Sequence, residues 1–184
     1  NFIGNPHVSA GGFFFLRTCL RIQIIVLLLS NKQKKNMDLK LNRPIVVFDL
    51  ETTGPSVSQD RIVEMSLLKV DPWGLTADGV WTLRFNPLKP IPAHITAIHG
   101  IADADVQDCP TFAECVGDID YYLNGCDLAG FNSHRFDLPL LVEEMLRADS
   151  TLDLRAARMI DVPSGTVTSN PSMVSVTICL DLAA

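Results

Sequence analysis

Apolar residues in the middle of the chain recur with two different periods, which predict both strands and helices. The segment 43–51 is almost continuously apolar, as expected for a central strand that is buried on both faces. Two further strand-like runs follow, separated by a turn around residues 71–79, so we expect an antiparallel meander. The predicted strands are RPIVVFDLE (43–51), RIVEMSLLKVD (61–71), GVWTLRFNP (79–87), CDLAGFN (126–132) and ARMID (157–161).

Two segments between these strands have the helical period. The first, residues 109–125, contains Thr111 and Glu114 three residues apart, which is the pattern of a capping box, and it ends at a glycine. The second, residues 136–148, has Asp137 in its first turn, where the helix dipole favours a carboxylate. The order strand, strand, strand, helix, strand, helix, strand predicts an α/β fold with a mixed sheet flanked by helices.

The start of the chain differs from the patterned region. Residues 1–36 are rich in apolar residues, but Arg17 and Arg21 interrupt them, and the unbroken apolar run is only Ile24 to Leu29. A helix that spans a membrane needs about 20 mostly apolar residues. We therefore expect residues 1–36 to be an N-terminal extension outside the functional domain, with a membrane anchor as the alternative.

The other end of the chain also changes in composition. Residues 162–184 contain no Lys, Arg or aromatic residue, and Ser and Thr are common. Within them VSVTICLDL (174–182) is a candidate edge strand, unless this end is mistranslated sequence. The functional domain is accordingly expected over residues 37–161, followed by an atypical tail.

Charge and cysteine content narrow the functional classes. The formal net charge is −6, so no overall basic field attracts nucleic acid, which argues against tight coating of DNA or RNA. An enzyme whose metal ions link its own acids to a phosphate remains compatible with this charge. The five cysteines are odd in number and form no CxxC pair, which argues against a disulfide framework or a zinc site. We expect a reducing, cytoplasmic location.

Three carboxylates lie where chemistry is expected. Asp49 and Glu51 end the first predicted strand and, being alternate residues, share the face of Ile45 and Val47. Two adjacent anions repel unless a cation neutralises them, and Mg²⁺ or Mn²⁺ suits such oxygen ligands. Asp137 follows a short strand, so it would converge with them if the two strands are neighbours. The alternatives are hydrated acids at a strand that emerges into solvent, and an ordinary first-turn aspartate.

Three stretches resemble successive motifs of one family: FDLETTG (48–54), AIHGI (97–101) and GFNSHRFDLP (130–139). They are similar to motifs of the DEDD 3′→5′ exonucleases, the DnaQ-like, DNA polymerase III epsilon-subunit branch of the ribonuclease H-like fold. The resemblance covers about residues 42–161. It implies a ribonuclease H-like sheet, two Mg²⁺ or Mn²⁺ ions, single-stranded DNA or RNA 3′ ends as substrate, and a DNA polymerase as a candidate partner.

The resemblance also implies a role for each matched residue. Asp49 would bind both metal ions, Glu51 one of them and Asp137 the other. The residues that would line the 3′-terminal nucleotide or shape its pocket are Thr52, Thr53, Gly54, His99, Asn132 and Phe136. From the residues alone, the alternative is that the two threonine hydroxyls only form hydrogen bonds within the turn. For His99, the separate alternative is that it only caps a loop.

One part of the family's pattern has no match. It requires a fourth acid on a late helix and a nearby His or Tyr as general base, but no histidine follows His134 and no tyrosine follows Tyr122. We therefore expect a fold incomplete at its C-terminus and weak or absent nuclease activity. One alternative is a non-catalytic module that binds 3′ ends. A phosphatase of the haloacid-dehalogenase type, with Asp49 as nucleophile, is disfavoured because Glu51 replaces its second aspartate.

Overall fold

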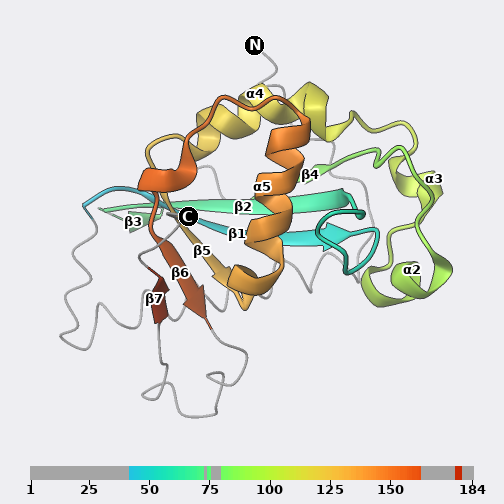
Figure 1. Cartoon of the computed structure of the whole chain (residues 1–184), viewed down its shortest axis with the longest axis horizontal. Helices are drawn as coiled ribbons and strands as arrows, with labels where there is room; N and C mark the ends of the chain where they lie inside the picture. The colour runs from blue at the N-terminus through green and yellow to red at the C-terminus, as the bar shows by residue number, and fades with distance from the viewer. Residues whose placement is uncertain (1–41, 73, 76–79, 163–176, 180–184) are drawn as a thin grey trace.

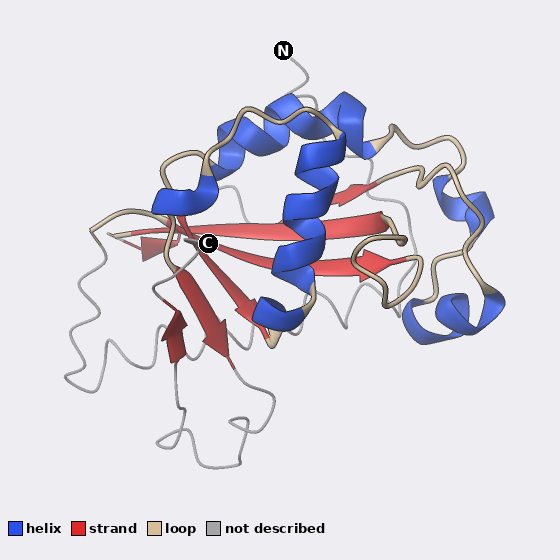
Figure 2. Ribbon diagram, in the orientation of Figure 1, coloured by secondary structure: helices blue, strands red, loops and turns tan. Residues whose placement is uncertain are grey.

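The structure is a computed structural model of the whole chain, and it describes residues 42–72, 74–75, 80–162 and 177–179. The strands of this part of the chain form one sheet, in the order β3-β2-β1-β5-β6-β7, with β4 also paired to β2 (Figures 1 and 2). They are β1 (Ile45–Thr52), β2 (Ile62–Asp71), β3 (Gly74–Leu75), β4 (Trp81–Arg84), β5 (Asp127–Phe131), β6 (Met159–Val162) and β7 (Thr177–Cys179).

The sheet is mixed, as predicted. Strand β1 pairs antiparallel with β2 and parallel with β5, and β5 pairs parallel with β6. Strands β2 and β4 are antiparallel, which confirms the meander. Strand β7 pairs with β6 inside the segment predicted as a candidate edge strand. Because β1, β5 and β6 run in the same direction, their carboxyl ends meet at one edge of the sheet.

Two long helices were predicted and two shorter ones were not. The helices are α2 (Ala93–His99), α3 (Asp103–Val106), α4 (Phe112–Leu123) and α5 (Asp137–Arg147), with 3₁₀ turns η1 (Ser133–Arg135) and η2 (Leu154–Ala156). Helix α4 begins at the predicted capping box, with the Thr111 N–H donating to Glu114 at 2.7 Å. Helices α2 and α3 are too short to show a clear helical period. Ile95 of α2 and Val106 of α3 instead pack with Val63 in a separate small cluster.

Both faces of β1 are buried. Val46, Phe48 and Leu50 belong to the main core, which also contains the apolar residues of α4 and α5. Figure 1 shows these two helices on the same side of the sheet. Ile45 and Val47 belong to a second cluster on the opposite face. The alternation places Asp49 and Glu51 on that second face, as the sequence predicts.

Several expectations from the sequence concern residues that the structure does not describe. Residues 1–36 and most of 162–184 lie outside the described residues. Among the described helices, none has the length and apolar content needed to cross a bilayer. Trp81 packs against Tyr122, with ring centroids 5.1 Å apart.

Candidate active site

The carboxyl end of β1 presents two acids on one face of the sheet. Asp49 is buried, with 3% of its surface exposed, and Glu51 is half-buried. Across the β1–β2 ladder Asp49 lies opposite Ser66, and Glu51 lies opposite Glu64. Because directly opposed residues share a face, Glu64 joins the two predicted acids. This end of the face therefore concentrates negative charge.

Glu64 was not predicted as a site residue. It is buried, and its carboxylate is ion-paired with the guanidinium of Arg84 on β4 at 2.8 Å. The available signal was an acid in the middle of the apolar segment 61–71, but its placement opposite Glu51 depends on the register between strands. The pair also brings a positive charge to the acidic face.

Asp137 is the first residue of α5 and is half-buried. The chain reaches it from β5, which is the parallel neighbour of β1, with Val47 level with Ala129. The two strand ends from which the acids were expected to converge are therefore adjacent at one sheet edge. Sequence spacing alone left that adjacency open.

The turn from β5 into α5 is held by buried hydrogen bonds. Ser133 is fully buried and donates to one oxygen of Asp161 on β6, from its backbone N–H at 2.8 Å and its hydroxyl at 3.2 Å. Asn132 precedes it in the left-handed conformation, with φ of 54°. A Cβ at Gly130 would lie within 2.5 Å of Ser133 Cβ, so only glycine allows this close approach. These contacts set the direction in which the chain enters α5.

Among the other residues of the motif at 130–139, some are exposed and one packs against the core. Asn132, His134 and Arg135 are exposed next to Asp137. Phe136 is half-buried and packs against the main core. The contacts of Asn132 and Phe136 with a nucleotide stay a prediction.

The two threonines after Glu51 hold the turn that follows β1. The Thr52 hydroxyl donates to the carbonyl of Gly54 at 2.8 Å. Thr53 is buried, and its hydroxyl donates to Asp60 at 2.9 Å. A Cβ at Gly54 would lie 2.6 Å from an Asp60 oxygen, which explains the glycine. Both hydroxyls therefore form hydrogen bonds within the turn, and their contact with a nucleotide stays a prediction.

His99 joins the end of α2 to the end of β1. It is 8% exposed, and its Nδ1 accepts a hydrogen bond from the Ile101 N–H at 3.0 Å. The neutral ring then carries its proton on Nε2, which donates to the Thr52 carbonyl at 3.1 Å. The histidine caps a loop and also anchors the backbone directly beside the acids.

Comparison with known proteins decides the family. Residues 46–162, more than half of the chain, match the RNase T family of exonucleases. The chain belongs to this family. The RNase T-type, or DEDD, proteins are 3′→5′ exonucleases, which hydrolyse phosphodiester bonds, as the motif resemblance implies.

Relatives support this assignment of the exonuclease domain. It is 35% identical over 109 residues to a DNA polymerase III subunit epsilon-like protein of Rhodobacter capsulatus, covering 59% of this chain and 15% of that protein. It is 35% identical over 98 residues to DNA polymerase III subunit epsilon of Treponema pallidum, covering 53% of this chain and 44% of the relative. The chain thus spans less than half the length of these relatives.

Solved structures confirm the fold. E. coli exonuclease I in complex with a dT13 oligonucleotide superposes with a TM-score of 0.54 at 17% identity, covering 59% of this chain and 25% of that one. Exonuclease I of Methylocaldum szegediense gives 0.53 at 21% identity, covering 58% and 24%. The predicted ribonuclease H-like mixed sheet flanked by helices is therefore confirmed.

The predicted ligands of the candidate site are of the type that hard metal ions prefer. Asp49, Glu51 and Asp137 offer only carboxylate oxygens, the ligands that Mg²⁺ and Mn²⁺ prefer. Asp49 and Glu51 share one face, and Asp137 begins the helix after the adjacent strand. Within the described ranges, no three His, Cys, Asp or Glu residues are already gathered closely enough to hold a metal ion.

Asp60 accepts several hydrogen bonds in the turn after β1. Burial by itself would raise the pKa of its carboxyl group. That effect is outweighed by a hydrogen bond from the Ser56 N–H and by further ones from Lys89 and Thr53, so the pKa lies below its ordinary value of 3.8. Ionised Asp60 therefore stabilises the turn in the folded protein.

This lowered pKa predicts a pH-dependent effect of Asp60→Asn. The ionised form contributes stability above the unfolded-state pKa, and that contribution disappears as the pH falls through the lower, folded-state pKa. We expect the variant to be less stable than the wild type at neutral pH and the difference to shrink below pH 3.8. Urea denaturation of both proteins from neutral pH to about pH 3 measures it. A difference that stays constant over this range contradicts the prediction.

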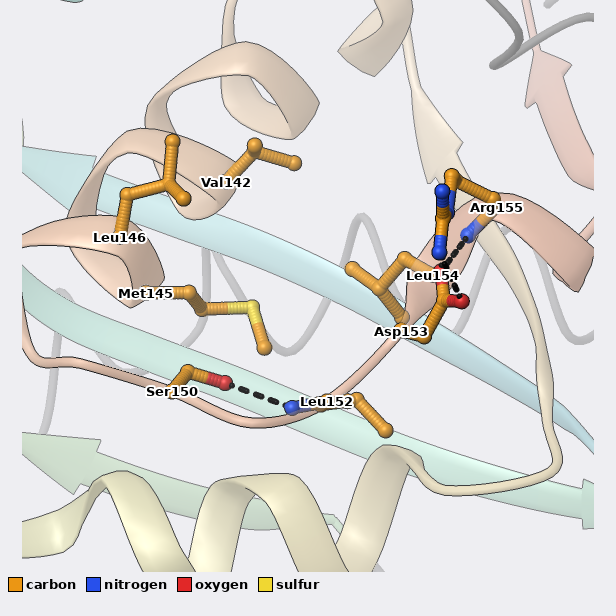
Figure 3. A pocket seen from close by; sticks show the side chains of 8 residues that line it. All are labelled: Val142, Met145, Leu146, Ser150, Leu152, Asp153, Leu154 and Arg155. Atoms are coloured by element: carbon orange, nitrogen blue, oxygen red, sulfur yellow. Dashed lines mark hydrogen bonds and ion pairs between the residues drawn. The ribbon is translucent and has the colours of Figure 1, made fainter.

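A separate pocket lies on another part of α5. It has a volume of about 220 Å³ and is lined by Val142, Met145 and Leu146 of the helix and by residues of the segment 150–155 (Figure 3). None of the predicted site residues lines it. This pocket is therefore not the candidate active site.

Proposed function

We propose that this domain removes nucleotides from the 3′ ends of single-stranded DNA or RNA by metal-dependent hydrolysis. One observation carries the proposal: Asp49 and Glu51 share a face at the end of β1, and the adjacent parallel strand leads directly to Asp137. Together with the family, this arrangement suits a pair of metal ions. The oligonucleotide bound by E. coli exonuclease I makes single-stranded DNA the first substrate to test.

The three carboxylates would hold two Mg²⁺ or Mn²⁺ ions. Bound there, the ions would supply an activated water and stabilise the leaving oxygen. The residues of the chain would position the 3′-terminal nucleotide: the Thr52–Gly54 turn along its sugar, with Asn132 and Phe136 shaping the pocket. His99 would act from the end of α2, through its bond to the Thr52 carbonyl. A DNA polymerase is the candidate partner, in line with the naming of the relatives.

We further propose that this 184-residue polypeptide turns over slowly. A general base contributes about 10²–10⁴-fold to rate. The sequence after β6 contains neither histidine nor tyrosine to fill that role. With a typical enzyme turning over about 10 times per second, we expect about 0.001–0.1 turnovers per second.

A 5′-labelled single-stranded oligonucleotide tests both proposals, with Mn²⁺ present or chelated. We expect slow, Mn²⁺-dependent shortening from the 3′ end, which a phosphorothioate at the last linkage should block. Turnover typical of a complete enzyme contradicts the slow-turnover proposal. Mn²⁺-dependent binding of 3′ ends without any shortening would favour the non-catalytic binding module. Absence of both binding and cleavage overturns the proposed function.

A further inference from the structure

A buried acid on α5 is held by two arginines. Glu144 is 1% exposed, and both of its oxygens accept hydrogen bonds from Arg61, at 2.5 and 3.1 Å. Arg147, one turn further along the helix, donates to the same carboxylate at 2.7 Å. Bidentate, charge-assisted bonds of this kind fix both position and direction. The two arginines therefore fix the position of the Glu144 carboxylate.

The cluster of Glu144, Arg61 and Arg147 connects α5 to the loop between β1 and β2. Arg147 also donates to the backbone carbonyls of Asp60 at 3.0 Å and Ser58 at 2.7 Å. Arg61 is bonded through its own backbone to Thr53: the Arg61 N–H donates to the Thr53 hydroxyl at 3.0 Å, and the Thr53 N–H donates to the Arg61 carbonyl at 2.9 Å. In Figure 1 this loop lies beside α5. Glu144 thus reaches, through one residue, the turn that directly follows Glu51.

The same helix carries the third acid. Asp137 and Glu144 are seven residues apart, close to two helical turns, so they lie on the same face of α5. At its start α5 is held by the contacts of Ser133 with Asp161, and further along by Glu144. A rigid helix fixed at both places sets where Asp137 stands relative to the end of β1.

We propose that Glu144 is a positioning residue, which holds the β1–β2 loop against α5 and thereby sets the spacing between Asp137 and the pair Asp49 and Glu51. The inference rests on the proposed function, because it concerns how these acids meet their metal ions. Supporting residues around metal ligands typically change metal affinity by about 10–100-fold. A cluster that serves stability alone would lower the unfolding temperature without changing the metal affinity of the folded protein.

The test compares Glu144→Gln with the wild type in two measurements. In the metal-free proteins, we expect faster amide hydrogen exchange in residues 53–61. In titrations with Mn²⁺, we expect the affinity of the folded variant to fall by about 10–100-fold. Ile119→Val, a substitution in the main core on α4, is the control for general loss of stability. It should change neither measurement at a temperature where the protein is folded.

A second variant covers the case in which Glu144→Gln does not fold. Arg147→Lys keeps the charge beside Glu144 but loses the planar group that also reaches the loop carbonyls, so it should show the same two changes more weakly. Unchanged exchange in residues 53–61 and unchanged Mn²⁺ affinity in a folded variant overturn the positioning role. A wild-type protein that binds no Mn²⁺ overturns the proposed function instead. The metal-free exchange measurement then still decides whether Glu144 holds the loop.

Discussion

Asp49→Asn is expected to lower the affinity for Mn²⁺ by at least about 100-fold, because a lost ligand should cost no less than a lost supporting residue. Asparagine keeps the shape of the side chain but removes its negative charge and one of the two carboxylate oxygens. The buried position beside Glu51 makes that charge important, since little solvent screens it. Metal-dependent binding of single-stranded 3′ ends should be lost together with Mn²⁺ binding. Calorimetric titration of the wild type and the variant with Mn²⁺ measures the effect.

The matched control for this prediction is Asp71→Asn. Asp71 is a carboxylate on the neighbouring strand, at the end of β2 far from the carboxyl edge of β1. It should leave Mn²⁺ binding unchanged. If Asp49→Asn retains wild-type affinity while its circular dichroism spectrum is native, the ions bind elsewhere and the proposed site is wrong.

Gly130→Ala is expected to destabilise the domain by about 1–3 kcal/mol, the usual cost of overpacking a filled interior. The added methyl group would overlap Ser133, which is fully buried. Relief of the overlap requires the hydrogen bonds between Ser133 and Asp161 to shift. Because this turn leads into α5, we also expect weaker Mn²⁺ binding. Urea denaturation measures the stability change.

Gly117→Ala provides the opposite expectation for the same substitution. Gly117 lies inside α4, and nothing lies within 4 Å of a Cβ placed there. Alanine should stabilise the helix by about 0.5–1 kcal/mol, because it restricts the unfolded chain more than glycine does. Equal effects of the two substitutions would contradict the steric explanation for Gly130.

The long elements and the capping box could be predicted because their signals are local. A continuous apolar run, a helical period and the spacing of Thr111 and Glu114 each depend on residues close in the sequence. The short helices α2 and α3 could not, because they depend on packing against Val63 from another strand. Their position matters for the site, since α2 ends at His99.

The candidate site was predicted in part for the same reason. Asp49, Glu51 and Asp137 stand at the ends of recognisable elements. Glu64 and Glu144 look like ordinary acids in a strand and a helix, and their burial beside arginines appears only in three dimensions. Likewise, the Thr53 hydroxyl points inward because it donates a hydrogen bond to Asp60, on the other side of the turn.

The sequence by itself determined the order of the strands β1, β2, β4, β5 and β6 and of the helices α4 and α5. It also determined the shared face of the two acids on β1 and the motifs of the exonuclease family. These follow from periodicity and from short runs of residues, which act over a few positions. Only the tertiary structure decided which strands are neighbours, that Glu64 lies opposite Glu51, and that Glu144 connects α5 to the loop after β1. Register and long-range ion pairs join residues far apart in the chain, and no local pattern specifies those distances.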